Sequence, residues 1–340
     1  MRYWTAGSAL LVALIILHCS HTKDYHQMMH KSFYPQKDVT ILVTDSGLGG
    51  LSVAAELASR LPGSGLFENI RLVFFNSLFH NQSGYNSLKN ERDKIRIFDA
   101  ALAAMATKYQ PDLLLIACNT LSVLYDKTAF SRQAQFPVIG IVETGVELIE
   151  QQFRFTPQSA VIIFATETTI GSHAHKKLLM KRGFHADQII EQACPGLAGS
   201  IERGYNSQET TELIQKYVTS AIHQAALSRP IFASLNCTHY GYSRQQFQEA
   251  FARAGYPELT ILDPNPRMAE ILFQSQRPAR FPTTQLIIEV VSKTEITAPK
   301  IVSLGQLLGR VSPATAEALK NYRFEPNLFD APFDTSSIEK

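Results

Sequence analysis

The chain has 340 residues, of which 45% are hydrophobic and 18% charged, and its formal net charge is +2. This length suits about two domains of roughly 100–200 residues each, and the apolar fraction is sufficient for buried cores. The near-neutral charge gives no reason to expect a nucleic-acid partner, and four scattered cysteines are too few for a disulfide scaffold.

The first residues have the pattern of an export signal. A basic residue precedes an apolar run of about a dozen residues, which is short for a membrane-spanning helix. Residues 16–20 resemble a bacterial lipobox with Cys19 as the lipidated residue, although His18 replaces the usual small residue. We therefore expect a signal peptide over residues 1–20 and an unpacked linker over 21–37. The protein would be exported, either periplasmic or anchored to the membrane as a lipoprotein, and an uncleaved anchor would give the same location.

Strand-like and helix-like patterns alternate along the rest of the chain. Short apolar runs predict strands, and apolar residues spaced three or four apart predict helices between them. The predicted strands cover residues 39–43, 70–75, 113–117, 137–142, 160–164, 231–235 and 259–262, and the predicted helices include 51–58, 92–109, a helix through 178, and 245–254. This alternation predicts an α/β protein with largely parallel sheets flanked by helices.

Polar side chains directly follow several predicted strands. Asp45 and Ser46 follow the first strand, Cys118 follows the third, and Cys237 follows a later strand with the same apolar character. Ligands of open α/β sheets bind at the carboxyl ends of the strands. Two such domains facing each other would place the two thiols on opposite walls of one cleft.

These repeats predict two pseudo-symmetric domains with the active site in the cleft between them. The first domain is expected to contain residues 38–145 and 258–282, and the second residues 146–257. Residues 283–340 have weaker periodicity and are expected to form a C-terminal extension without a chemical role.

The two strand-end cysteines are the main candidates for chemistry. A helix start stabilises a thiolate, so we expect the pKa of Cys118 and Cys237 to lie below the usual value of about 8.5. Cys194 lacks this setting and is expected to be structural. His239, two residues beyond Cys237, could exchange protons with a reacting group. Either cysteine alone could be an inert core residue, but two in equivalent settings indicate a pair of reagents.

Two further patterns carry less weight. The glycines at positions 47, 49 and 50 are not followed by Gly-Lys-Ser/Thr, so a phosphate-binding P-loop is not supported. His173 and His175 could chelate a metal, but no carboxylate or cysteine ligand pattern accompanies them, and we predict no metal site. A metal hydrolase using these two residues with His239 is the least favoured alternative.

Taken together, the motifs resemble those of glutamate racemase, within the aspartate/glutamate racemase superfamily. The resemblance covers roughly residues 38 to 282. Its three main motifs are residues 45–53, Cys118-Asn119-Thr120 and Cys237-Thr238-His239-Tyr240, and smaller matches lie at residues 142–143, 165–169, 193–195 and 201–204.

The resemblance implies a racemase that needs no cofactor and acts on a small molecule, glutamate or a related acidic amino acid. Cys118 and Cys237 would be opposed acid/base groups, one a thiolate and one a thiol, with Cys237 taking the proton from the L-form. Asp45 and His239 would assist them, and Glu143 would lie in a supporting position behind the site. Residues implied to hold the substrate are Ser46, Ser83, Gly84, Asn119, Thr120, Thr168 and Thr238. A homodimer is compatible with this resemblance.

The chain also departs from the family pattern. Gln82-Ser83-Gly84 stands where relatives have Pro-Tyr-Gly, Asn236 replaces a glycine, and Gly241 replaces a proline. Because the altered loop helps to seat the substrate, a racemase for aspartate or another amino acid is an alternative to one for glutamate. Another alternative is an amino-acid-binding lipoprotein without turnover, although a binding protein has no need of two matched thiols.

Overall fold

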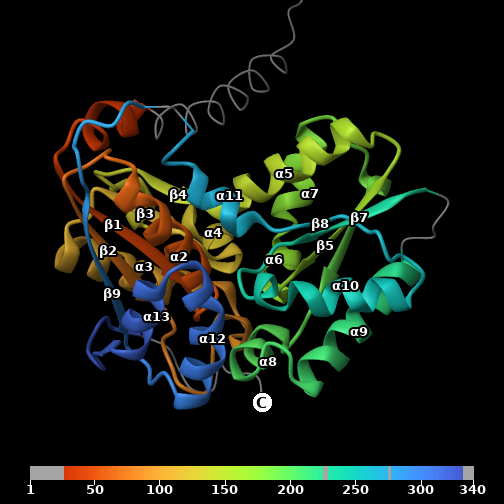
Figure 1. Ribbon diagram of the computed structural model, residues 1–340. Coiled ribbons are helices and arrows are strands. Elements are labelled where there is room, and N and C mark those ends of the chain that lie inside the picture. The colour runs from red at the N-terminus through yellow and green to blue at the C-terminus, as the bar shows by residue number, and fades with distance from the viewer. Residues whose placement is uncertain (1–26, 225–228, 275–276, 332–340) are drawn as a thin grey trace, which may run out of the picture.

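The computed structural model of the chain describes residues 27–224, 229–274 and 277–331. Two sheets, each flanked by helices, form two domains side by side (Figure 1). The pairings within both sheets are parallel, so the predicted fold class is confirmed. The predicted signal peptide lies outside the described residues. Within those residues, no helix combines the length and apolar character needed to cross a membrane.

The first domain is built on a six-stranded sheet in the order β10-β9-β2-β1-β3-β4. Alternate side chains of β1 enter opposite cores, with Ile41 and Val43 on one face and Leu42 on the other. Burial on both faces explains the nearly continuous apolar strands of the sequence. The strands are β1 (Asp38–Asp45), β2 (Asn69–Asn76), β3 (Leu113–Ile116), β4 (Val138–Gly140), β9 (Gln285–Ser292) and β10 (Arg323–Phe324).

Helices cover both faces of this sheet. Leu51, Met268, Leu304 and Leu319 come from four helices that share one core, and the other core contains helix residues such as Phe98. The helices of the first core are α2 (Leu51–Arg60), α11 (Pro264–Glu270), α12 (Ala298–Val311) and α13 (Pro313–Lys320); those of the second are α3 (Glu91–Tyr109) and α4 (Asn119–Tyr125).

The second domain is built on a four-stranded sheet in the order β6-β5-β7-β8. Its strands are β5 (Ala160–Ala165), β6 (Ile189–Ala193), β7 (Ile231–Leu235) and β8 (Ile261–Leu262). Its helices are α5 (Ile141–Phe155), α6 (Glu167–Ser172), α7 (Ala174–Lys181), α8 (Leu197–Arg203), α9 (Gln208–Gln224) and α10 (Arg244–Arg253). The predicted single helix through residue 178 is two helices, because His173 between them has a φ of 53° and interrupts the turn.

The domain boundaries differ from the expectation. The strand predicted over 137–142 ends at Gly140, and α5 begins at the next residue. β8 pairs with β7 in the second sheet, so the return to the first domain comes after residue 262 rather than at 258. The pairing of β8 with a strand 26 residues or more upstream is a tertiary contact that no local pattern could indicate.

The described parts of both terminal segments pack into the first domain, although the sequence predicted an unpacked linker and a C-terminal extension. Residues 285–292 form β9, which pairs along its full length with β2, so the segment after 283 is a structural part of the domain and not an appended extension. Of the predicted linker over 21–37, the described residues 27–37 pack on this domain, since Met29 and Phe33 are buried and the Phe33 ring lies 5.0 Å from that of Phe67. In both segments, burial of apolar and aromatic side chains stabilises the packed structure, although the overall composition of the segment is polar.

Candidate active site

The polar strand ends of both domains line one cavity of about 910 Å³. In the first domain, Asp45 and Ser46 end β1 and Cys118 follows the neighbouring strand β3. In the second domain, Thr166 follows β5 and Cys237 follows the neighbouring strand β7 in the same relation. The predicted convergence of both cysteines on one site is therefore present in the fold, because parallel strands end at the same edge of each sheet.

Cys118 occupies the N-cap position of α4. Its sulfur accepts the backbone N–H of Leu121 at 3.4 Å and lies 3.2 Å from the Ser46 hydroxyl. The pKa of Cys118 is nevertheless raised well above 9.0, first by burial and then by the nearby Asp45 carboxylate. The helix start therefore does not lower this pKa as expected: desolvation outweighs the few hydrogen bonds that favour the thiolate. Cys118 rests as a thiol.

Cys237 lies beside His239, and it does not stand at the start of an α-helix as predicted. It lies ahead of a 3-10 turn over Tyr240–Ser243, and its sulfur is 3.7 Å from Nδ1 of His239. Burial by itself lowers the pKa of His239, but the hydrogen bonds to Cys237 and Glu202 raise it well above 6.5. A histidine held as imidazolium stabilises a neighbouring thiolate. The two cysteines therefore have unlike surroundings: Cys118 faces the Asp45 carboxylate, and Cys237 faces a charged imidazole.

Glu202 of α8 holds His239 from behind. Its Oε1 lies 2.8 Å from Nε2 of His239 and accepts the backbone N–H of Leu48 at 2.8 Å, and its Oε2 accepts Nζ of Lys300 at 2.6 Å. Burial by itself raises the pKa of Glu202, but the bonds from His239 and Lys300 lower it to about 2. Glu202 is thus a buried carboxylate with a donor on each side.

The glycine loop after β1 allows the two domains to approach closely. A Cβ atom on Gly49 would lie 2.4 Å from the Thr238 hydroxyl and 2.6 Å from Nδ1 of His239, and one on Gly47 would lie 2.6 Å from Oε1 of Glu202. Close approach of backbone to catalytic side chains is a use of glycine that needs no phosphate. The loop after β1 serves contact between the domains.

Asp45 joins the two halves of the site. Its Oδ2 accepts the Thr238 hydroxyl at 2.6 Å across the domain interface, and its Oδ1 accepts the backbone N–H of Gly47 at 3.1 Å. Burial raises the pKa of Asp45 above 3.8, while the charge of His239 and the Thr238 hydroxyl oppose that rise. Asp45 therefore lies near Cys118 and is bonded to the residue after Cys237, and its assisting role stays a prediction.

Several buried polar atoms on the cavity wall lack a partner. Both amide atoms of Asn119 and the Tyr85 hydroxyl have no hydrogen-bond partner among the described residues, although both side chains are buried. Both residues line the cavity, as do Thr120 and Thr166, whose hydroxyls lie 2.8 Å apart. Buried polar groups without partners are costly, so these atoms indicate a place for a polar ligand.

All of the predicted substrate-binding residues except Thr168 reach the cavity. Those that line it are Ser46, Ser83, Gly84, Asn119, Thr120 and Thr238. Thr168 is absent from the lining, since Lys94 donates to its hydroxyl at 2.8 Å and Thr166 takes the place at the end of β5. Glu143 lies in the first turn of α5 and pairs with Arg182, so it does not support the site.

Sequence reasoning missed three parts of the site. Glu202 lies in the motif match at 201–204 without an assigned role, Tyr85 directly follows the altered loop and was given none, and Lys300 lies in the segment given no chemistry. Cys194, expected to be structural, is buried and also reaches the cavity wall. Only the motif around Glu202 carried a usable signal.

The histidines of the metal-hydrolase alternative have separate partners. His173 lies 2.6 Å from Glu191 near the surface, and His175 is buried 2.9 Å from the Asn236 amide. His239 is held between Cys237 and Glu202. Among the described residues, no group of three or more histidine, cysteine or acidic side chains has the arrangement to hold a metal ion.

Comparisons with known proteins identify the family of the chain. A family model described as Asp/Glu/hydantoin racemase matches residues 50–267. Glutamate racemase from Chlorobaculum tepidum is 27% identical over 226 residues, which are 66% of this chain and 75% of that protein. Glutamate racemase from Lysinibacillus sphaericus is 30% identical over 207 residues, covering 61% of this chain and 71% of that protein.

Solved structures show the same fold. Glutamate racemase from Francisella tularensis, in complex with D-glutamate, superposes with a TM-score of 0.61 at 20% identity, covering 84% of this chain and 95% of that one. The family match spans both domains from the glycine loop to α11 and includes both cysteine motifs. The chain therefore belongs to the Asp/Glu/hydantoin racemase family.

Proposed function

We propose that the protein is an amino-acid racemase that works without a cofactor and uses Cys118 and Cys237 as its two acid/base groups. The observation that carries this proposal is the position of both thiols on one cavity, each from a different domain and each with its own proton-handling partners. A racemase must remove the α-proton from one face and supply a proton to the other, which requires two groups of this kind.

The unlike surroundings of the two thiols suggest the direction in which the resting enzyme is ready to act. The Cys237 thiolate, beside the His239 imidazolium, takes the α-proton of the L-amino acid, and the Cys118 thiol gives its proton to the opposite face. The bond from carbon to the first proton breaks, the bond to the second forms, and the carbanion between them is neutralised. The enzyme is left with a Cys237 thiol and a Cys118 thiolate, the state that acts on the D-form.

The polar atoms on the cavity wall support an amino acid as the ligand. The Asn119 amide offers both donors and an acceptor, while the hydroxyls of Tyr85, Thr120 and Thr166 offer either. A carboxylate and an amine together would satisfy such a set. Glutamate is the proposed substrate because the curated relatives named above are glutamate racemases; aspartate or another amino acid is the alternative that the changed loop at 82–85 favours.

We also propose that the enzyme is exported. The support is the basic start, the apolar run and the lipobox-like residues 16–20. Expression of the full chain followed by cell fractionation, with Cys19→Ala in parallel, tests this proposal. Periplasmic or membrane-bound protein is expected, and a lipid anchor would be lost in the variant; a wholly cytoplasmic protein would contradict export.

The reaction is tested by incubating residues 21–340 with L- and D-glutamate, aspartate and a wider amino-acid panel in D₂O under reducing conditions. Loss of the α-proton is followed by NMR and inversion by chiral chromatography. Deuterium incorporation with inversion is expected, and Cys118→Ala and Cys237→Ala should each abolish inversion. Cys194→Ala, which removes a third thiol from the same wall, should retain it. Stoichiometric binding without proton exchange would overturn the racemase and favour the binding lipoprotein.

A further inference from the structure

Lys300 joins the site from outside the part of the chain that matches the racemase family. It lies in the first turn of α12, beyond the matched residues 50–267, and it lines the cavity. Its ammonium donates to Oε2 of Glu202 at 2.6 Å, and its side chain is 23% exposed against 7% for Glu202. A long side chain thus reaches from the C-terminal segment to the carboxylate behind His239.

The position of α12 explains this reach. The helix packs against α2 of the first domain and also against α8 of the second, the helix that carries Glu202 (Figure 1). The strand β9 leads to α12 and fixes it to the first sheet through its pairing with β2. Through α12, Lys300 therefore connects the first domain to Glu202 on the cavity wall of the second domain.

We propose that Lys300 is a positioning residue that sets the orientation and proton affinity of the pair Cys237 and His239 by acting through Glu202. The proposal rests on the function proposed above, in which Cys237 is the group that acts on the L-form. Lys300 itself does not contact His239 or the reacting atoms.

The geometry gives Lys300 two effects. A carboxylate turns freely about its last bond unless both oxygens are held, and Lys300 holds Oε2 while Oε1 faces His239 and the Leu48 N–H. With Oε2 fixed, Oε1 stays directed at Nε2 of His239. The ammonium also offsets part of the Glu202 charge. His239 therefore keeps its positive charge, but its proton is held less tightly than beside an unpaired carboxylate and can still exchange.

The other ionisable groups facing this pair are the same in all the proteins that are compared within one measurement. Asp45 faces His239 from β1, Tyr242 lies near Asp45 and Glu202, and Cys194 and Tyr240 lie near Cys237. A difference between variants at position 300 therefore results from loss of the Lys300 ammonium and not from a change in another ionisable group.

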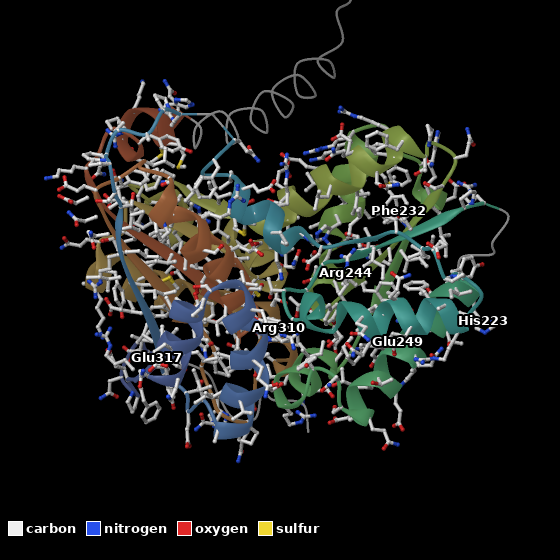
Figure 2. All side chains as sticks on the ribbon, in the orientation of Figure 1. His223, Phe232, Arg244, Glu249, Arg310 and Glu317 are labelled. Atoms are coloured by element: carbon white, nitrogen blue, oxygen red, sulfur yellow. The ribbon has the colours of Figure 1, made fainter. Side chains whose placement is uncertain are left out.

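The test compares Lys300→Met with Lys300→Arg, and with Arg310→Met as the matched control. Arg310 is an exposed cation near the far end of the same helix, so its loss changes the net charge equally (Figure 2). The first measurement is the pH dependence of Cys237 alkylation by iodoacetamide in a Cys19→Ser, Cys118→Ser, Cys194→Ser background, in which Cys237 is the remaining cysteine of the sequence. Because a nearby cation lowers the pKa of an acid, Lys300→Met should move this profile upward by about half to one pH unit.

The second measurement is racemisation by the enzymes with all thiols present. Lys300→Met should lower kcat by about ten- to a hundred-fold with a small effect on KM, since misplacement of a base affects the transition state more than binding. Lys300→Arg should recover most of the rate, and Arg310→Met should match the parent. An unchanged alkylation profile in Lys300→Met, with loss only of thermal stability, would show a merely structural lysine and overturn the inference.

The two readouts separate this inference from the proposed reaction. Alkylation requires no turnover, so a shifted profile in a protein that racemises nothing would retain the role of Lys300 in setting the thiol and reject the reaction. Normal racemisation with an unshifted profile would reject the role of Lys300 alone.

Discussion

Replacing Glu202 with glutamine is the most direct test of the buried charges in the site. The substitution keeps the size of the side chain and an oxygen to accept the Leu48 N–H, but it removes the negative charge between His239 and Lys300. Two positively charged groups would then face a neutral amide in a buried position. Loss of one partner from a buried pair is strongly destabilising because it leaves the other charge uncompensated.

The size of the effect follows from the pKa of Glu202. Burial opposes ionisation, but the bonds from His239 and Lys300 lower the pKa from its ordinary 4.5 to about 2. At about 1.4 kcal/mol for each unit of pKa, the carboxylate contributes about 3 kcal/mol to the free energy of unfolding. Since the folded pKa is the lower one, this contribution is complete above pH 4.5 and is lost as the pH falls from 4.5 to about 2.

Urea unfolding followed by circular dichroism at pH 7 and pH 3 measures this contribution. At pH 7, Glu202→Gln should lower the free energy of unfolding by up to about 3 kcal/mol, and at pH 3 the difference from the parent should shrink to less than about half. Glu209→Gln is the matched control, because Glu209 is exposed and pairs with Arg203, and it should change stability by less than about 0.5 kcal/mol. A deficit in Glu202→Gln that is equal at both pH values, or below about 1 kcal/mol at pH 7, would refute the reasoning.

Three further predictions address other parts of the molecule. Burial lowers the pKa of His175 from 6.5 to about 4, so stability present above pH 6.5 should fall by about 3 kcal/mol toward pH 4, and His175→Gln should lack this fall in urea unfolding at the two pH values. An equal pH dependence in both proteins would contradict this. Thr238→Val removes the 2.6 Å hydrogen bond to Asp45 and should lower kcat/KM by about ten- to a hundred-fold, while Thr238→Ser should stay near the parent; equal losses in the two variants would argue against a role for the hydroxyl. Gly49→Ala places a Cβ 2.4 Å from the Thr238 hydroxyl and should cost about 1–3 kcal/mol of stability together with activity, whereas Gly63→Ala, with nothing within 4 Å, should affect neither; matching melting temperatures for the two variants would count against close domain contact at the loop.

The local sequence was sufficient for the framework of the fold and for most of the site. β1, β2, β3, β5 and β7 were all predicted within about two residues, because strands buried on both faces leave apolar runs that no amphipathic helix imitates. The convergence of Asp45, Cys118 and Cys237 followed from the same runs, since Asp45 ends β1 and each cysteine lies two residues beyond the end of its strand. Parallel strands then bring such residues to the same edge of the sheet, whatever the fold of the rest of the chain.

Tertiary structure alone decided the proton affinities and the outer part of the site. The Cys118 thiol was expected to ionise readily at a helix start, but its pKa depends on burial and on Asp45, which a sequence pattern does not report. The contact between Glu202 and Lys300 joins residues 98 positions apart through the packing of α12 on both domains. Local patterns fix which residues end a strand, whereas desolvation and long-range charge depend on what the folded chain places around them.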